Sequence, residues 1–321
     1  MRREVIARAP TRIDLGGGWT DVPPYCDREG GFVCNVAITR YSIATLSPAS
    51  AAGADAGVEH APLVRAALRR SGAEGVHVSL RNEFPVGAGL GGSSAASAAL
   101  LAALRTWRGQ PIDRVEIAEE GRRIEVEELG VAGGRQDHYA ATHGGALALT
   151  FETGVTVRRI PLSRATRDAL VASATLIYTG ESRISGDTIT AVLDAYNARE
   201  PRVVSALGAM RALAVDMAAA LESCDLHALG ELLDEHWHHQ RSLHPSIPTA
   251  RIDEIVTQAL RAGALGAKAM GASGGGCVLI LSRPGKRMEV ADSVRSLGEI
   301  IEFDVDCDGV SIVESGTRDG Q

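Results

Sequence analysis

The stretch from Pro85 to Leu104 reads PVGAGLGGSSAASAALLAAL and carries the strongest structural signal in the chain. Four closely spaced glycines allow backbone angles that a Cβ atom would block, so the first half predicts a tight loop. Ser93 and Ser94 stand where the following alanine- and leucine-rich helix should begin, and serine is a favoured N-cap residue. The first turn of a helix has free N–H groups and the positive end of the helix dipole, so this loop predicts a phosphate-binding site.

The same loop allows other interpretations that differ in the ligand. Gly87, Gly89 and Gly92 match the dinucleotide fingerprint G-x-G-x-x-G, which is weak evidence alone. An acidic residue is expected about 20 residues further on, but Asp113 lies beyond the helix end predicted at 109–111. The loop also lacks the Gly-Lys-Ser/Thr ending of a Walker A motif. Two serines entering a helix favour a nucleotide phosphate with Mg²⁺; the simplest alternative makes both serines plain N-caps.

The length, composition and charge of the chain limit the classes of protein to which it can belong. The chain has 321 residues, enough for two domains or one large one. It is 45% hydrophobic and only 4% aromatic, so the core should consist mainly of Ala, Val, Leu and Ile. The net charge of −7 argues against a nucleic-acid partner, which would need a broad basic face. A local basic pocket for a phosphorylated substrate remains compatible with this charge.

Cysteine usage and hydropathy indicate a cytoplasmic protein with no membrane partner. The five cysteines are odd in number and contain no CxxC pair, which argues against a disulfide framework and a structural zinc site and fits a reducing cytosol. The N-terminus MRREVIARAP has no apolar segment typical of a secretion signal. The most membrane-like run, Ala95 to Leu104, is too short to span a bilayer.

Hydrophobic periodicity predicts strands concentrated in the first half and helices in the second. We expect strands at 3–9, 31–46, 76–80, 144–151, 155–160, 174–179 and 300–306. We expect helices at 61–71, 114–129, 137–142, 187–196, 203–221, 225–241 and 251–261, besides the one after the serines. A second glycine-rich loop, within 266–281, runs into a further strand. The change in character places a domain boundary near residue 165, giving domains 1–165 and 166–321.

Three separated motifs resemble those of the GHMP kinase superfamily, which includes galactokinase, homoserine kinase and mevalonate kinase. In order, they are Ala9-Pro10-Thr11-Arg12-Ile13-Asp14, the run from Pro85 to Ala95, and the run from Lys268 to Cys277. The resemblance implies an α+β, two-domain fold. Its N-terminal domain would hold a mixed sheet with helices, its C-terminal domain would also be α+β, and the active site would lie in the interdomain cleft.

Further segments narrow the resemblance to one branch of sugar kinases. RIDLGGGWTDVPP (12–24), GRQDHYAA (134–141) and YTGESR (178–183) are similar to the D-glycero-D-manno-heptose 7-phosphate kinases. The first of these segments also resembles the kinase part of bifunctional L-fucose kinases. This branch implies ATP-dependent phosphorylation of an aldose at its anomeric hydroxyl.

The resemblance assigns the glycine-rich loop to the phosphates of ATP. The implied cofactor-binding residues are Pro85, Gly87, Gly89, Leu90, Gly91, Gly92, Ser93, Ser94 and Ala95. Ser94, or else Ser93, would ligate or orient Mg²⁺, and Glu125 matches the metal-binding glutamate by spacing. Glu127 and Glu128 are competitors, and on a helix Glu125 and Glu128 share a face. The alternative is a solvated charged helix over 122–128.

Catalysis is assigned to two residues. Asp137 matches the catalytic aspartate of the family, which would accept a proton from the anomeric hydroxyl. Arg12 is its implied partner, a fixed cation that would stabilise the carboxylate charge and balance the transferring phosphoryl group. For an isolated aspartate in a glycine-rich loop, the alternative is an Asx-turn.

Recognition of the acceptor sugar is assigned to residues from three segments. Carboxylates accept strong hydrogen bonds from neighbouring hydroxyls. The implied substrate-binding residues are Asp14, Thr20, Asp21, Arg183, Gly274, Gly275 and Gly276. Arg183 would hold a distal phosphate, with Lys268 as a weaker candidate, although Arg183 could equally be a surface arginine. Asp14 could instead only mark a strand end.

A histidine-rich helix segment suggests a metal site that the rest of the sequence does not support. His236 and His239 are three residues apart on a predicted helix and could share a metal, with His238 between them. Zinc requires three or four protein ligands, and no matching pair stands out elsewhere. A polar helix face near the cleft is the simpler interpretation.

The sequence therefore predicts a sugar-1-kinase that uses ATP and Mg²⁺, with heptose 7-phosphate as the favoured substrate. An L-fucose-type or other free-sugar kinase is the alternative enzyme, and a catalytically silent sugar sensor is the alternative without chemistry. The expected partner is a small sugar or sugar phosphate, and a homodimer is possible.

Overall fold

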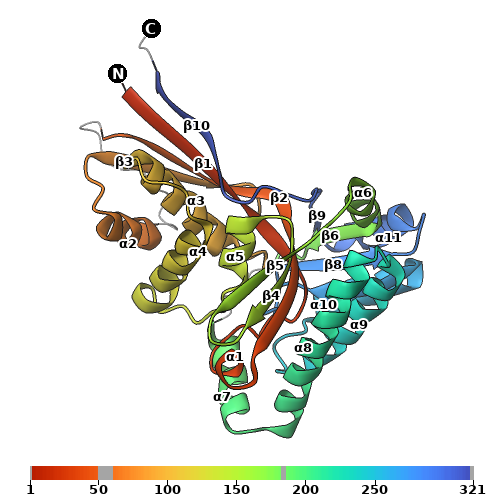
Figure 1. The fold of residues 1–321 in the computed structure, drawn as a ribbon. Helices are drawn as coiled ribbons and strands as arrows, with labels where there is room; N and C mark the ends of the chain where they lie inside the picture. The colour runs from red at the N-terminus through yellow and green to blue at the C-terminus, as the bar shows by residue number, and fades with distance from the viewer. Residues whose placement is uncertain (1, 50–60, 182–185, 319–321) are drawn as a thin grey trace.

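Two antiparallel sheets, joined by one buried core, organise the chain (Figure 1). The computed structural model describes residues 2–49, 61–181 and 186–318. The first sheet has the strand order β10-β1-β2-β4-β5, with β3 also paired to β2. The second sheet has the order β7-β8-β6-β9.

The strands and helices have the following bounds. The first sheet contains β1 (Arg2–Gly16), β2 (Gly31–Pro48), β3 (Val76–Asn82), β4 (Ala146–Phe151), β5 (Val155–Ile160) and β10 (Ser311–Arg318). The second contains β6 (Ala174–Tyr178), β7 (Ala264–Ala269), β8 (Cys277–Ser282) and β9 (Glu299–Ile300). The helices are α1 (Tyr25–Glu29), α2 (Ala61–Ser71), α3 (Gly92–Trp107), α4 (Arg114–Arg123), α5 (Gln136–His143), α6 (Arg164–Ser173), α7 (Gly186–Asn197), α8 (Pro201–Glu222), α9 (Leu226–Ser242), α10 (Ala250–Ala262) and α11 (Arg287–Val294), with a π-turn at Ile124–Glu128 and a 3₁₀ turn at Arg295–Leu297.

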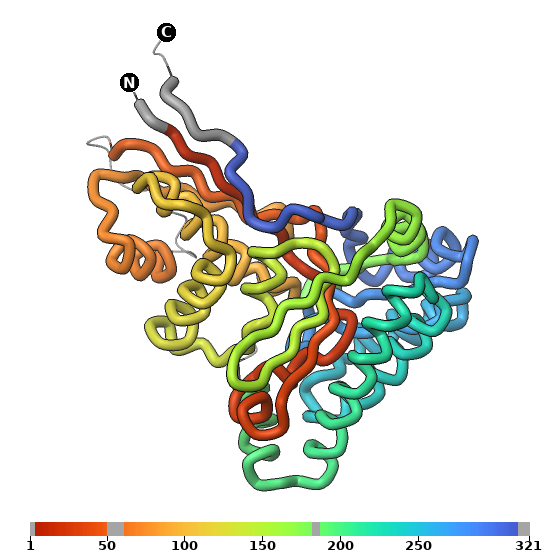
Figure 2. The backbone as a smooth tube through the Cα atoms, in the orientation of Figure 1, coloured from red at the N-terminus to blue at the C-terminus, as the bar shows by residue number. Residues whose placement is uncertain are grey.

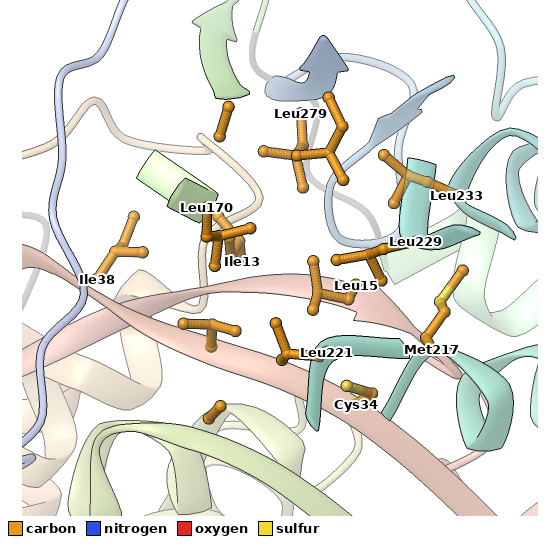
Figure 3. Close-up of a cluster of buried hydrophobic side chains, with 14 of the residues drawn as sticks. Ile13, Leu15, Cys34, Ile38, Leu170, Met217, Leu221, Leu229, Leu233 and Leu279 are labelled. Atoms are coloured by element: carbon orange, nitrogen blue, oxygen red, sulfur yellow. The ribbon is translucent and has the colours of Figure 1, made fainter. Parts of the chain in front are cut away.

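The core between the sheets follows from the alternation of side chains along β1 and β2. Ile13 and Leu15 of β1 lie on the same face of the sheet as Cys34 of β2. This face meets leucines and a methionine from α6, α8, α9 and β8, which belong to the second half of the chain (Figure 3). Because apolar side chains from both halves share this cluster, burial of their surface holds the two sheets together.

The opposite face of β1 and β2 is covered by α3 and α5. α3 contains a run of alanines that are all buried, and short side chains allow a helix to approach a sheet closely. The N-termini of both helices carry residues singled out in the sequence: Ser93 and Ser94 on α3, and Asp137 on α5. The fold thus places the N-termini of α3 and α5 near Arg12 of β1.

The α+β, two-domain fold expected from the sequence is confirmed, but the first sheet is not mixed. Every strand pairing in the part of the chain that the structure describes is antiparallel. β2 is long enough to pair with β1 on one side and with β3 and then β4 on the other. The connections between neighbouring strands therefore return in antiparallel order, and no parallel crossover is needed.

The C-terminal end of the chain differs from the prediction. The strand expected at 300–306 is limited to Glu299–Ile300, which pairs with β6, and a single bridge from Val305 to Ile38. The segment leaves the second sheet and crosses to the first, where β10 pairs with β1 so that the two ends of the chain run side by side (Figure 2). The domain boundary near residue 165 stays a prediction. β10 lies within the predicted domain 166–321 but pairs with a strand of the first sheet.

One helix is long and apolar enough to cross a membrane by length and composition. It is α8, and half of its apolar window is buried inside the protein. The sequence had instead pointed to 95–104 as the most membrane-like run. α8 packs against α9 and the first sheet, and a core helix of this kind passes the same test.

Candidate active site

One cleft, with a volume of about 660 Å³, collects most of the residues that the sequence singled out. Residues 84–94 line it, together with Arg12, Glu125 and Asp137. Eight of the nine predicted cofactor-binding residues are therefore in the cleft. The ninth, Ala95, belongs to α3 and is buried in the core.

Buried side chains and backbone hydrogen bonds anchor the glycine-rich loop to the rest of the protein. Ala88 and Leu90 are buried in the core between the sheets, while the glycines around them face the cleft. The Leu90 carbonyl accepts a hydrogen bond from the Arg12 backbone, and the Ala88 carbonyl accepts one from Cys277. Gly89 has φ +73°, and a Cβ there would lie 2.8 Å from the Met270 carbonyl oxygen. Only glycine fits this close approach without movement.

Ser93 and Ser94 do not cap α3, contrary to the simplest interpretation of the sequence. The N-cap is Gly91, with φ 73° and no side-chain cap. Both serines lie in the first helical turn, and their hydroxyls reach the Glu125 carboxylate at 2.5 Å for Ser93 and 3.5 Å for Ser94. The hydroxyls are thus directed at an acidic side chain beside the start of a helix, where the free N–H groups favour anions.

Glu125 is the glutamate that faces the cleft. It lies in the π-turn after α4, whereas Glu128 is bound by Arg69 and Arg70 on the opposite side, and Glu127 is exposed. Burial raises the pKa of Glu125, but His138 and the two serine hydroxyls outweigh burial and leave the pKa lowered. Glu125 therefore remains ionised, as a cation ligand must be.

The oxygen donors around Glu125 fit Mg²⁺. Among the described residues, no group of three or more His, Cys, Asp or Glu side chains could hold a metal. Mg²⁺ does not need such a group, because it usually takes one or two protein oxygens and completes its shell with phosphates and water. Glu125 and Ser94 supply that type of donor beside the predicted phosphate loop.

Arg12 and Asp137 form a close ion pair at the centre of the cleft. Arg12 Nη2 lies 2.6 Å from Asp137 Oδ1, and Nε donates to the same oxygen at 2.7 Å. Nη1 donates to the Gly89 carbonyl at 2.7 Å, so one guanidinium ties the acid to the phosphate loop. A Cβ on Gly91 would lie 3.0 Å from Asp137 Cγ, which shows that the carboxyl faces the loop. The Asx-turn alternative does not describe this arrangement.

Asp21 also lines the cleft. Its Oδ2 accepts hydrogen bonds from the backbone N–H groups of Arg135 and Gln136 at the start of α5. Burial raises its pKa to about 6, partly opposed by the Gln136 hydrogen bond and increased by the charges of Asp137 and Asp14. Gly134 must be glycine, because a Cβ would lie 1.8 Å from Asp21 Oδ2.

Asp14 is a second buried carboxylate that lines the cleft. Its Oδ2 lies 2.9 Å from Lys268 Nζ, and both side chains are almost fully buried. Burial raises the pKa of Asp14, but the charges of Lys268, His236 and Arg12 outweigh this effect and leave the pKa lowered. Lys268 is thus the buried partner of Asp14, which does not fit the phosphate-binding role considered from the sequence.

Other predicted substrate residues do not reach the cleft. The Thr20 hydroxyl is buried and bonds to the carbonyls of Gly17 and Phe32, so it stabilises the turn instead. Gly274, Gly275 and Gly276 do not line the cleft. A Cβ on Gly276 would lie 2.9 Å from the Ala88 carbonyl, so the second glycine loop supports the first. Arg183 lies outside the described residues.

The histidine-rich segment has a structural explanation on α9. His236 is fully buried, and its Nε2 accepts a hydrogen bond from the Gly17 N–H at 2.9 Å. Burial holds its pKa well below the ordinary value, so the ring is the neutral acceptor that this bond requires. His238 and His239 contact each other edge to face, and the zinc interpretation has no ligand set among the described residues.

Several cleft residues were missed by the sequence analysis. Gln136, Trp19 and Ile189 line the cleft, and His138, which does not line it, contacts the cleft residue Glu125. Gln136, His138 and Trp19 lie inside the quoted motifs, and that position was the only signal available. Ile189 gave no signal, because it reaches the cleft only through the placement of α7.

One cleft thus brings together a glycine-rich loop at a helix start, a carboxylate flanked by serine hydroxyls, and an arginine-held aspartate, which are the kinds of group that phosphoryl transfer uses. Residues 60–145 match the family of GHMP kinases N terminal domain, and residues 217–300 match GHMP kinases C terminal. The galactokinase of Mycobacterium tuberculosis (strain H37Rv) is 30% identical, over 92% of this chain and 94% of its own length. The chain belongs to the GHMP kinase family and is therefore an ATP-dependent kinase.

Two further similarities concern heptose kinases. The D-glycero-alpha-D-manno-heptose 7-phosphate kinase of Campylobacter jejuni is 26% identical over 96% of this chain and 98% of its own. The crystal structure of a D-glycero-D-manno-heptose 1-phosphate kinase from Bacteroides thetaiotaomicron superposes with a TM-score of 0.77 at 24% identity, covering 98% of this chain and 100% of that one. The structural likeness shows a shared fold.

Proposed function

We propose that this protein is a sugar-1-kinase that transfers the γ-phosphoryl group of ATP to the anomeric hydroxyl of D-glycero-D-manno-heptose 7-phosphate, giving the 1,7-bisphosphate. One observation carries the proposal. The carboxyl group of Asp137, held by Arg12, faces the glycine-rich loop, and the same cleft continues to Asp14 and Asp21. An acid so placed lies between a nucleotide site and a polar acceptor site.

The proposed roles follow from this arrangement. ATP supplies the phosphoryl group, and Mg²⁺ bound by Glu125 and Ser94 neutralises its charge. The N–H groups at the start of α3 bind phosphate oxygens. Asp137 accepts the proton of the attacking hydroxyl, and Arg12 fixes the carboxylate and stabilises negative charge nearby.

The acceptor end of the cleft supports a polyhydroxylated substrate. Asp14 Oδ1, Trp19 Nε1 and Gln136 Oε1 are buried and have no hydrogen-bond partner within the described residues. All three side chains line the cleft. A sugar hydroxyl both donates and accepts, so neighbouring hydroxyls could satisfy the two oxygens and the indole N–H together. Leaving such groups unpaired costs free energy, which favours a ligand that pairs them.

A free-sugar kinase of the L-fucose type is the second candidate. One observation favours it: the acceptor end contains the three carboxylates Asp14, Asp21 and Asp137, which would repel a distal phosphate. A heptose 7-phosphate would therefore depend on Arg183 as the counter-charge.

A substrate panel with product identification tests the proposal. ADP release is measured with heptose 7-phosphate, free heptose, L-fucose, galactose and mevalonate, and ³¹P NMR locates the new phosphate. We expect phosphorylation at the anomeric oxygen of heptose 7-phosphate, with Arg183→Ala raising its KM. Turnover of L-fucose alone would favour the second candidate. Sugar binding without ADP release would indicate a silent sensor.

A further inference from the structure

We propose that His138 is a positioning residue that holds the Glu125 carboxylate in the orientation for binding Mg²⁺. Through this contact, α5 sets the spacing between the metal-binding carboxylate and Asp137. The inference rests on the proposed function in one respect, that Glu125 binds the metal of the nucleotide.

The first observation is the contact itself. His138 Nε2 lies 3.2 Å from Glu125 Oε2, and Ser93 Oγ contacts the other carboxylate oxygen, Oε1, at 2.5 Å. Only 2% of the His138 side chain is exposed, and neither ring nitrogen makes a hydrogen bond within the described residues, which leaves the ion-pair contact with Glu125. The Glu125 carboxylate is thus held from two sides, and His138 has no other polar role.

The second observation concerns the space that the ring occupies. A Cβ on Gly121 would lie 2.9 Å from His138 Cδ2 and 2.8 Å from Ser97 Oγ. Gly121 is on α4, one helical turn before Glu125. The lack of a side chain at Gly121 therefore leaves space for the imidazole ring of His138. One turn further along the helix lies Glu125, whose carboxylate the ring contacts.

The third observation is the order of residues on α5. Successive residues of a helix point about 100° apart, so neighbours can serve different groups. Asp137 is bound by Arg12, and the next residue, His138, contacts Glu125. The first turn of α5 therefore fixes the distance between Asp137, on the acceptor side, and the Glu125 carboxylate, on the nucleotide side.

Two amide variants separate positioning from simple packing. In His138→Gln, the side-chain amide nitrogen can occupy the place of Nε2. In His138→Asn, the amide is one methylene shorter and does not reach Glu125. Both variants are neutral and smaller than histidine, and the melting temperature reports the additional packing that the shorter Asn loses. His143→Gln on the same helix is the control, because His143 contacts Tyr139 and Thr142 rather than the cleft.

The experiment measures Mg²⁺ affinity in the presence of ADP by calorimetry, ADP affinity in EDTA, and the melting temperature. Loss of a residue that orients a metal ligand typically weakens metal affinity by about 10- to 100-fold. We expect His138→Asn to weaken Mg²⁺ binding at least about tenfold, with ADP affinity in EDTA unchanged. His138→Gln and His143→Gln should stay within about threefold of the unaltered protein.

Other outcomes would overturn the inference. Equal Mg²⁺ affinity in the Asn variant and the unaltered protein would show that Glu125 needs no support from His138. Equal weakening in the Asn and Gln variants would show that packing matters and a donor at Nε2 does not. If the unaltered protein shows no Mg²⁺-dependent ADP binding, the assignment of the cofactor fails as well, which distinguishes failure of the proposed function from failure of the positioning role alone.

Discussion

At the scale of single residues, Asp21 is a cleft carboxyl group whose burial disfavours its ionised form. Asp21 is almost fully buried, and burial raises its pKa to about 6. Two backbone N–H groups of Arg135 and Gln136 bind one of its oxygens but do not offset burial. A charge retained at a cost in stability is typical of a functional site.

Asp21→Asn should therefore stabilise the fold at pH 8. Because the folded-state pKa is raised, the stability contributed by Asp21 is present below its unfolded pKa of 3.8 and is lost as pH rises through about 6. The difference between these pKa values corresponds to at most about 3 kcal/mol, and asparagine keeps an oxygen for both N–H groups. Urea unfolding at pH 8 and pH 4 should show a gain that disappears at pH 4, while the KM for the sugar rises. A variant that is less stable at pH 8 would contradict this account.

At the scale of elements, two glycines at the ends of α3 can be compared directly. Gly91 and Gly109 flank α3, and both have φ near +70°. A Cβ on Gly91 would lie 3.0 Å from Asp137 Cγ, whereas nothing lies within 4 Å of a Cβ on Gly109. The two positions share a backbone conformation but differ in their contact with the acid.

Gly91→Ala and Gly109→Ala form a matched pair. Each should lose about 1 kcal/mol of stability, because alanine disfavours the left-handed conformation. Only Gly91→Ala should also reduce kcat, by about tenfold or more, since it displaces Asp137. Melting temperature and steady-state turnover check both effects. A similar loss of kcat in Gly109→Ala would mean that the backbone strain alone is responsible.

Elements with strong local signals could be predicted from the sequence, while those that depend on distant pairing could not. The glycine–serine stretch predicted a loop followed by α3, and β-branched alternation predicted β2. β10 was missed because its sequence, SIVESGTR, is short and polar, and it becomes a strand through pairing with β1. Alternation over 300–306 predicted a strand, but the chain there is passing between two sheets.

The same distinction applies to the candidate site. Arg12, Glu125 and Asp137 could be selected from motifs, and the structure brings them to one cleft. The placement of Lys268 beside Asp14 could not be predicted, because these residues are 254 positions apart and meet only when the sheets pack. The contact of Ser93 with Glu125 was also not evident, since the direction of the serine side chain depends on Gly91 being the N-cap.

At the scale of the whole molecule, a buried ion pair connects the two sheets. Lys268 on β7 is fully buried and contacts both the carboxylate and the carbonyl oxygen of Asp14 on β1. Directly after β1, the Gly17 N–H donates a hydrogen bond to His236 of α9. These polar contacts fix the register of one domain against the other across an otherwise apolar core.

Lys268→Met should destabilise the protein by about 3–5 kcal/mol, because it leaves the Asp14 charge buried without a partner. Adding Asp14→Asn removes that charge and should recover a large part of the loss. A double-mutant cycle from urea unfolding measures the coupling between the two positions. Strictly additive effects would show that the pair does not contribute to the contact between the sheets.

We propose that Asp137 acts on the acceptor hydroxyl, beside a nucleotide site that binds ATP without it. The most direct measurement compares ATP affinity and turnover with heptose 7-phosphate in the unaltered protein and in Asp137→Asn. We predict unchanged ATP affinity and a kcat lower by about 10²- to 10⁴-fold, the range typical of general-base catalysis. Equal turnover in the two proteins would contradict the account.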